Sequence, residues 1–142
     1  MSNIGDILEG RSGELWSVRS EQSVLDAIRL MAEKGIGAVL VLDDNHLSGI
    51  LSERDYTRKV ILENRSSRDT QVRDIMTTSV ITCNRSRGVM DCLSMMTEND
   101  FRHLPVMEED EVIGMISIGD LVKAVIKEQQ FTIEQLEHYI AG

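Results

Sequence analysis

Two stretches of this sequence carry the same polar residues in the same order. Gly49–Asp55 reads GILSERD and Gly114–Asp120 reads GMISIGD. In each stretch an apolar run leads to a serine and, three residues later, to an aspartate, which is typical of a strand that turns into a helix. A serine hydroxyl beside the unpaired N–H groups of a helix start suits a phosphate, and the aspartate, one turn on, can accept hydrogen bonds from the vicinal hydroxyls of a ribose. The spacing therefore suits a nucleoside phosphate.

The same Ser-x-x-Asp pattern also caps a helix without any ligand. The serine then accepts a hydrogen bond from a backbone N–H, and the acid reaches back to the N–H of the serine. Such a cap stabilises a helix by about 0.5 to 2 kcal/mol, which is enough to explain the residues on its own. The two interpretations are compatible, because a serine that caps an empty site can also meet a phosphate.

The segment Trp16–Asp55 aligns with Ile81–Asp120 without a gap. Eight of these aligned positions are identical, whereas average composition gives about two or three by chance. A weaker match, in a slightly different register, pairs Gly5–Leu8 with Arg73–Met76. The chain is therefore predicted to contain two copies of one unit.

Each copy shows the pattern strand, helix, strand, strand, helix. Ser23 is the expected N-cap of the first helix, and the last two strands are expected to form a hairpin. Their continuous apolar runs indicate a sheet covered on both faces, and two copies this small must pack together through their sheets. The fold class is thus α/β (α+β), with two pseudo-symmetric β-α-β-β-α repeats. The expected bounds are helices Ser23–Lys34 and Val89–Asn99, strands Ala38–Leu42, Leu47–Leu51, His103–Met107 and Val112–Ile116, and last helices from Ser52 and Ser117.

The expected division of the chain is residues 1–70 for the first repeat with an N-terminal segment, 71–127 for the second repeat and 128–142 for a C-terminal helix. In that last part, Phe131–Ile140 places apolar residues at helical spacing. The favoured interpretation is a helix that caps the core of its own chain, and the alternative is a helix that docks on a second subunit.

Composition restricts the partners and the compartment. The 142 residues include 15 Lys+Arg and 24 Asp+Glu, for a formal net charge of −9. This charge disfavours DNA and RNA, whose binding depends on basic residues. The apolar run Ile36–Leu42 is far shorter than the roughly 20 residues of a membrane span, and the N-terminus does not resemble a secretory signal, so we expect a cytoplasmic protein without membrane contact. Cys83 and Cys92 are expected to be small, semi-buried apolar residues.

The repeated unit, with DIM before it in the second copy, RHLPV in the middle and GMISIGD at the end, resembles the cystathionine β-synthase (CBS) domain. Two in tandem would make a CBS pair, or Bateman module, and the resemblance covers nearly the whole chain. It implies a regulatory ligand-binding fold that takes AMP, ADP, ATP, NAD(H) or S-adenosylmethionine in clefts between the repeats. It also implies ribose contacts from Asp55 and Asp120 and phosphate contacts from Ser52 and Ser117.

The two copies differ where a base or a second phosphate would lie. Gly37 and Ala38 give the first copy a wall of small residues, whereas Arg102 and His103 give the second copy a cationic wall. The alternative is that Arg102 is a solvent-exposed charge and His103 a half-buried strand residue. Leu40 stands where the second copy has Pro105, a departure from the family pattern. Ser17 and Thr82 match positions that touch the base in the family. The expected ligand contacts are Ser17, Gly37, Ala38, Ser52, Arg54 and Asp55 in the first copy, and Thr82, Arg102, His103, Leu104, Pro105, Ser117 and Asp120 in the second.

Catalysis is not expected. The three histidines lack the spacing of metal ligands, the acids at the hairpin turns suit solvated turns, and no glycine-rich phosphate loop occurs. We therefore expect a homodimeric regulatory module, not an enzyme, with no catalytic cofactor or metal, which binds an adenine nucleotide such as AMP, ATP or NAD(H) and signals energy or redox state to a protein target. The alternative is a constitutive dimerisation or scaffold module with degenerate pockets.

Overall fold

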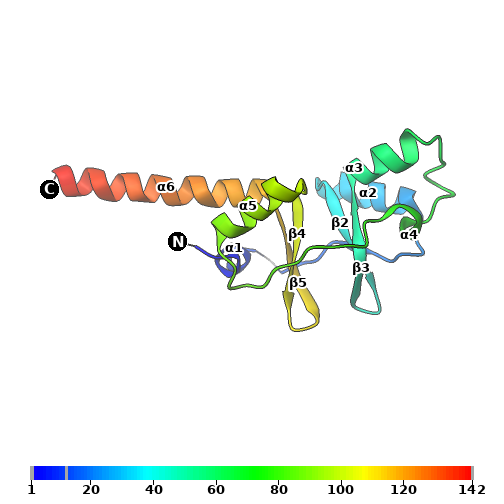
Figure 1. Cartoon of the computed structure of the whole chain (residues 1–142), viewed down its shortest axis with the longest axis horizontal. Coiled ribbons are helices and arrows are strands. Elements are labelled where there is room, and N and C mark those ends of the chain that lie inside the picture. The colour runs from blue at the N-terminus through cyan, green and yellow to red at the C-terminus, as the bar shows by residue number, and fades with distance from the viewer. Residues whose placement is uncertain (1, 12, 142) are drawn as a thin grey trace. The chain divides into compact units, whose positions relative to one another are not determined.

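The computed structural model describes residues 2–11 and 13–141, which form two compact units (Figure 1). One unit contains residues 15–81 and 109–112, and we call it the first-repeat unit. The other contains the described residues of 1–14, 82–108 and 113–142, and we call it the second-repeat unit. The expected division placed residues 1–70 together, but the N-terminal segment up to Glu14 belongs to the compact unit of the second repeat.

The first-repeat unit is a three-stranded sheet with helices packed on it. Strand β1 (Ser17–Val18) runs parallel to β2 (Ala38–Asp43), and β2 forms an antiparallel hairpin with β3 (His46–Ser52). Helix α2 (Val24–Lys34) begins at the predicted N-cap Ser23, whose side chain accepts from Asp26 N–H at 3.1 Å. It ends at Gly35, whose φ of 63° is a left-handed conformation that glycine adopts without strain. The predicted hairpin and helix are thus confirmed.

The core of the first-repeat unit lies between α2 and one face of the sheet. Val24, Ala27 and Met31 of α2 pack with Val39 and Val41 of β2. Ala38 and Leu40, which alternate with the two valines, are also fully buried. Strand β2 is therefore covered on both faces, as its continuous apolar run predicts.

The second-repeat unit repeats this arrangement in the predicted alignment. Helix α5 (Val89–Asn99) and strands β4 (His103–Glu108) and β5 (Glu111–Ser117) begin and end at the positions equivalent to α2, β2 and β3. The parallel pair Val18 and Val41 in the first repeat has its counterpart in the parallel bridge between Cys83 and Val106. The second core packs around α5, and it includes the buried free thiols of Cys83 and Cys92.

Two short helices precede the repeats and exchange between the units. Helix α1 (Ile4–Glu9) belongs to the second-repeat unit, and α4 (Val72–Ile75) belongs to the first-repeat unit. They begin at equivalent positions of the weaker match between the two copies. Ile4 of α1 is fully buried in the core of the second repeat, and Val72 and Ile75 of α4 are buried in the core of the first. Each short helix thus completes the core of the other repeat.

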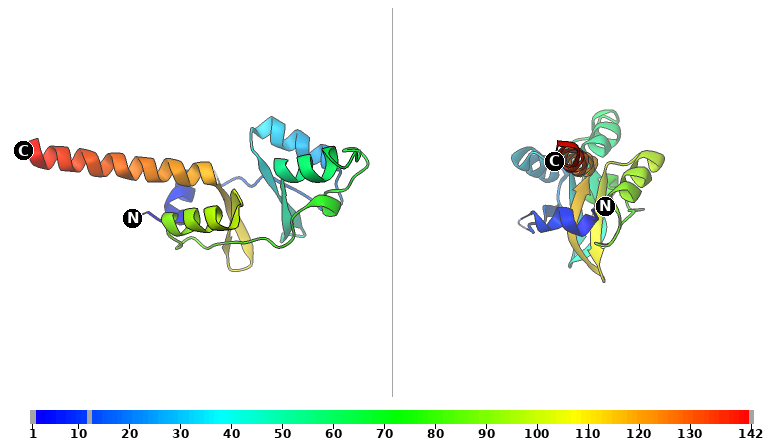
Figure 2. Two further views of the ribbon diagram at one scale, coloured as in Figure 1. Left: turned by 45° about the horizontal axis from the view of Figure 1, so that its top comes forward. Right: turned by 90° about the vertical axis from the view of Figure 1, so that its left-hand side faces the viewer.

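The last helices of the two repeats differ. In the first repeat, α3 (Glu53–Tyr56) continues into the π-helical turn η1 (Thr57–Ile61) and ends there. In the second repeat, α6 runs without interruption from Ile118 to Ala141, and its C-terminal half continues past α1 and α5 of its own unit (Figures 1 and 2). Phe131, Ile133, Leu136, Tyr139 and Ile140 are 54–84% exposed. The expectation that this segment caps the core of its own chain is therefore wrong, because these side chains contact no core.

No helix within the described residues is long and apolar enough to cross a membrane.

Candidate functional site

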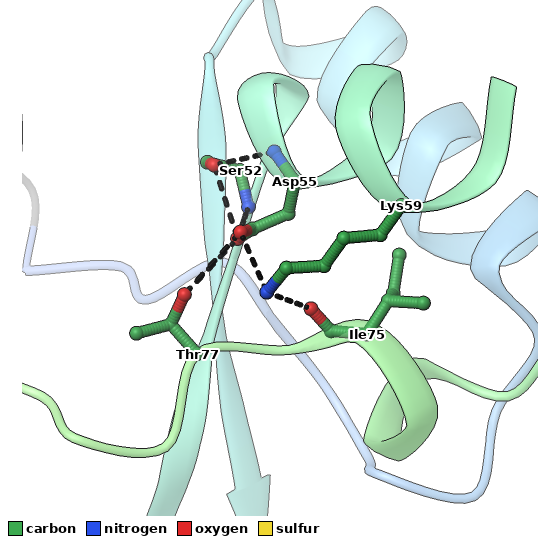
Figure 3. Close-up of polar contacts among 5 residues, drawn as sticks. All are labelled: Ser52, Asp55, Lys59, Ile75 and Thr77. Carbon is green, nitrogen blue, oxygen red and sulfur yellow. Dashed lines mark hydrogen bonds and ion pairs between the residues drawn. The ribbon is translucent and has the colours of Figure 1, made fainter. Parts of the chain in front are cut away.

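The first Ser-x-x-Asp pattern lies where β3 turns into α3. Ser52, the last residue of β3, is opposite Ala38 of β2, and Glu53 N–H donates to the carbonyl of Gly37 at 3.0 Å. Asp55 N–H donates to Ser52 Oγ at 3.1 Å, and Ser52 N–H donates to Asp55 Oδ2 at 3.0 Å (Figure 3). These reciprocal bonds form a capping box, so the capping interpretation of the motif is confirmed.

The second pattern forms the same corner where β5 turns into α6. Ile118 N–H donates to the carbonyl of Arg102 at 2.9 Å, which repeats the bond between Glu53 and Gly37. Ser117 N–H donates to Asp120 Oδ2 at 2.7 Å, and Asp120 N–H donates to Ser117 Oγ at 3.2 Å. The two corners thus share the same reciprocal capping bonds, and in the first corner Ser52 Oγ also donates to Asp55 Oδ2 at 3.1 Å.

Each aspartate also contacts a cation of its own unit, and the first of these is Lys59. Its Nζ lies 3.2 Å from Asp55 Oδ1 and donates to the carbonyl of Ile75 at 2.9 Å, so it joins η1 to the end of α4 (Figure 3). Thr77 Oγ1 lies 3.3 Å from the same carboxylate oxygen. The Asp55 side chain is only 13% exposed. Its carboxylate is therefore held in one orientation by groups from three segments.

The cation at the second corner is Arg11, which follows α1. One guanidinium nitrogen lies 2.6 Å from Asp120 Oδ2, and the other donates to the carbonyl of Met115 at 2.8 Å. Burial alone would raise the pKa of Asp120, but the hydrogen bonds from Ser117 N–H and Arg11, with the charge of Arg11, hold this pKa below its ordinary value. Asp120 is thus an ionised carboxylate at neutral pH, and its side chain is 26% exposed.

Sequence reasoning missed Lys59, Thr77 and Arg11. Lys59 follows Asp55 by four residues, so the spacing of charge pairs on helices could have identified it. Arg11 and Thr77 reach the corners only because α1 and α4 are exchanged between the units. No local pattern in the sequence indicates that exchange.

The other predicted contacts divide between the two units. Gly37 and Ala38 lie beside Ser52 at the start of β2, and Ser17 of β1 pairs with Leu40 of the same strand. In the second-repeat unit, His103 opens β4 directly after the exposed Arg102. The first-repeat unit thus holds Ser17, Gly37, Ala38, Ser52, Arg54 and Asp55, and the second-repeat unit holds Thr82, Arg102, His103, Leu104, Pro105, Ser117 and Asp120.

Leu104 and Pro105 are buried strand residues. The Leu104 side chain is fully buried in the hydrophobic core of the second-repeat unit. The carbonyl of Pro105 accepts a hydrogen bond from Cys83 N–H at 3.1 Å. Their surroundings match those of Val39 and Leu40 in the first repeat, both of which are also fully buried. Packing alone thus accounts for the side chain of Leu104.

A groove of about 420 Å³ lies beside the first corner but not at its serine and aspartate. Its lining includes Ile28 and Met31 of α2, Gly37 at the start of β2, and Tyr56 of α3. The groove is mainly apolar, whereas the hydrogen-bonding groups of the corner are Ser52 and Asp55. The polar groups of the candidate site thus lie at the corner and not in the groove.

The fold and the repeated corner define a protein with two tandem CBS-type repeats. The sequence pattern of the CBS domain matches residues 4–61 and 72–127, and the chain belongs to the CBS domain family. The CBS domain-containing protein CBSX3, mitochondrial, of Arabidopsis thaliana is 38% identical over 151 residues, which cover 99% of this chain and 73% of that protein. Proteins of this family are generally regulatory rather than catalytic.

Solved structures show the same fold. A putative signal-transduction protein with CBS domains from Burkholderia ambifaria is 48% identical, with a TM-score of 0.87 over 93% of this chain and 99% of that one. The CBS domain pair of protein MJ0100, solved in complex with 5′-methylthioadenosine and S-adenosyl-L-methionine, has a TM-score of 0.80 at 22% identity over 90% of this chain and 98% of that one. The predicted pair of CBS repeats is thus confirmed.

Within the described residues, no three His, Cys, Asp or Glu side chains lie together in a group that could hold a metal ion.

Proposed function

We propose that this protein is a regulatory module that binds an adenine nucleotide, of the AMP, ADP, ATP or NAD(H) type, at its Ser-x-x-Asp corners. The observation that carries the proposal is the repetition of one corner in both units. The same strand-to-helix junction, serine and half-buried aspartate occur twice with the same hydrogen bonds. The ligands in the MJ0100 domain pair both contain an adenosine group and support that part of the proposed ligand. Neither carries a phosphate, so the proposed phosphate contact rests on the serine at each helix start.

The capping bonds leave both side chains able to bind a ligand. A serine hydroxyl that accepts a bond from an N–H still has a proton to donate. The Ser52 hydroxyl donates to Asp55 Oδ2 at 3.1 Å in the unliganded protein, and we assign the protons of Ser52 and Ser117 to a phosphate oxygen in the liganded protein.

A carboxylate has about four acceptor positions. Asp120 accepts from Ser117 N–H and Arg11 and has positions left for the ribose hydroxyls. Asp55 already accepts from Ser52, Thr77 and Lys59, so we propose that ribose hydroxyls replace the hydroxyls of Ser52 and Thr77 there. Lys59 and Arg11 keep these carboxylates oriented before the ligand arrives. We assign base and phosphate contacts to Arg102 and His103 as well.

Regulation would follow from differential affinity. A nucleotide that binds one arrangement of the protein more tightly shifts the equilibrium towards that arrangement by the difference in binding free energy. We propose that the conformational shift signals the energy or redox state of the cell to a protein target. The signalling protein would be a homodimer without enzymatic activity. We propose the cytoplasm as its compartment, although the Arabidopsis relative carries the description mitochondrial.

A constitutive scaffold is the second candidate, and one observation favours it. Both aspartates already have an internal cation, at 3.2 Å for Asp55 and 2.6 Å for Asp120. Carboxylates satisfied in this way hold the fold together without any ligand. In that case the corners are structural and the protein serves only to join partners.

A thermal-shift panel separates the two candidates. AMP, ADP, ATP, NAD, NADH and S-adenosylmethionine are each added to the full chain, and a ligand at 100 times its dissociation constant should stabilise the native state by about 2.7 kcal/mol. Asp55→Asn and Asp120→Asn should reduce the ligand-induced shift, measured from the melting temperature of each unliganded variant. Asp26→Asn and Asp91→Asn change exposed, repeat-equivalent carboxylates and should not reduce it. If none of the six ligands shifts the melting temperature, the scaffold is the better account.

A further inference from the structure

One exposed face of α6 carries apolar residues at a regular spacing of seven. Ile126, Ile133 and Ile140 form one series, and Val122, Gln129 and Leu136 form a second series that alternates with it at steps of three and four. This is the heptad spacing with which two helices pack along a common seam. We call these six residues the α6 seam. Its five apolar side chains are 43–83% exposed, and Gln129 is exposed as well.

The N-terminal part of α6 contacts its own unit through a different set of residues. Leu121 is fully buried in the core of the second-repeat unit, and Ile118, Ala124 and Val125 pack partly against that core. The α6 seam begins one residue after Leu121 and continues to Ile140, about 27 Å further along the helix. In Figures 1 and 2 the C-terminal half of α6 runs beyond the helices of its unit. Packing within the chain thus leaves the seam open.

We propose that the α6 seam pairs antiparallel with the α6 seam of a second copy of this chain. A two-fold axis near Phe131 places Ile126 opposite Leu136 of the second copy, and Ile133 opposite Gln129. The same axis places Ile140 opposite Val122. Every seam residue then has a partner, and the surface is complementary to itself, as a two-fold dimer requires. The pairing gives the proposed homodimer a defined interface and does not depend on the proposed ligand.

Charge decides the direction of the pairing. Lys123 and Glu137 flank the seam on the same side, near its two ends. In the antiparallel arrangement each Lys123 lies opposite Glu137 of the second copy, so the ion pair forms twice. A parallel, in-register pair would place Thr132 beside Glu137 and Val125 beside Gln130, with no opposite charges. Complementary charges at the flanks of a seam set partner and orientation.

Sedimentation velocity on the full chain tests the interface with one matched pair of variants. Ile133→Glu places a charge inside the seam and should weaken dimerisation by about 100-fold or more, since a buried unpaired charge is strongly destabilising. Phe131→Glu makes a comparable change two residues away, off the seam, at a side chain that is 62% exposed. It should leave the dissociation constant within about 3-fold of wild type. A monomeric wild type, or equal behaviour of the two variants, overturns the proposal.

Charge exchange and cross-linking test the direction. Lys123→Glu and Glu137→Lys should each weaken the dimer, and the double exchange should restore it. Under oxidation, Ile126→Cys mixed with Leu136→Cys should give the mixed disulfide dimer, and neither variant alone should cross-link. Disulfide dimers of each variant alone would indicate a parallel pair and overturn the antiparallel arrangement. A nucleotide that shifts the melting temperature of monomeric Ile133→Glu would show that the proposed function survives a failure of this interface.

Discussion

Alanine at the two equivalent glycines of β3 and β5 should have very different effects. An added Cβ at Gly49 would lie 2.6 Å from the carbonyl oxygen of Thr77, whereas one at Gly114 would lie 2.7 Å from Cδ2 of Leu8. The carbonyl of Thr77 is fixed, because it accepts a hydrogen bond from Ile50 N–H at 3.0 Å. To relieve the clash this carbonyl must move, and the backbone and its hydrogen bond must move with it. The Leu8 carbon is the end of a flexible side chain that can rotate away.

Gly49→Ala should therefore lower the free energy of unfolding by about 3 kcal/mol, and Gly114→Ala by about 1 kcal/mol, the two ends of the range for overpacked sites. For a chain of this size the melting temperature falls by about 2 to 4 °C per kcal/mol, so Gly49→Ala should melt about 4 to 8 °C below Gly114→Ala. Urea denaturation and calorimetry measure both quantities. Equal losses, or a larger loss for Gly114→Ala, would show that the carbonyl of Thr77 does not limit the space at Gly49.

Three further predictions concern single groups. Arg11→Met should lower stability by about 1 kcal/mol, a figure discounted for solvent screening. Because the folded pKa of Asp120 is lowered, the stability difference between wild type and Arg11→Met should have its full size above the ordinary aspartate pKa of about 3.9. It should vanish as the pH falls through the folded pKa of Asp120. Urea titrations at several pH values measure this difference, and a value that does not change with pH would contradict the prediction. Ser117→Ala should cost about 1 kcal/mol in chemical denaturation through loss of the cap, and an unchanged midpoint would argue against it. Burial, with the nearby Cys92 thiol, raises the pKa of Cys83 to about 12, so thiol labelling at pH 8 should follow global unfolding; rapid labelling of the native protein would contradict this.

The internal repeat explains why much of the fold was predictable. Once the two copies are aligned, each helix and strand is read twice, and the expected bounds of α2, α5 and the two hairpins lie close to those observed. The corners followed from the same repeat, because Ser-x-x-Asp forms a local cap whose bonds join positions only three apart. Features that depend on local periodicity were therefore accessible.

Features that depend on long-range packing were not predictable in this way. The exchange of α1 and α4 between the units leaves no trace in local periodicity, so Arg11 was not connected with Asp120. The apolar pattern of Phe131–Ile140 indicates that one face of a helix is apolar, but it does not indicate what covers that face. The segment therefore fitted an intramolecular cap as well as an interface, and only its exposure in α6 decides against the cap.

The proposed function requires that Asp55 and Asp120 recognise the vicinal hydroxyls of a ribose. The most direct measurement is a calorimetric titration with the ribo and 2′-deoxy forms of the nucleotide that gives the largest thermal shift. A hydrogen bond to a charged group contributes about 1.5 to 3 kcal/mol, so the 2′-deoxy form should bind about 10- to 100-fold more weakly. The combined Asp55→Asn and Asp120→Asn variant should lose most of this discrimination. Equal affinities of the wild-type protein for the two forms would rule out recognition of the ribose 2′-hydroxyl by these carboxylates.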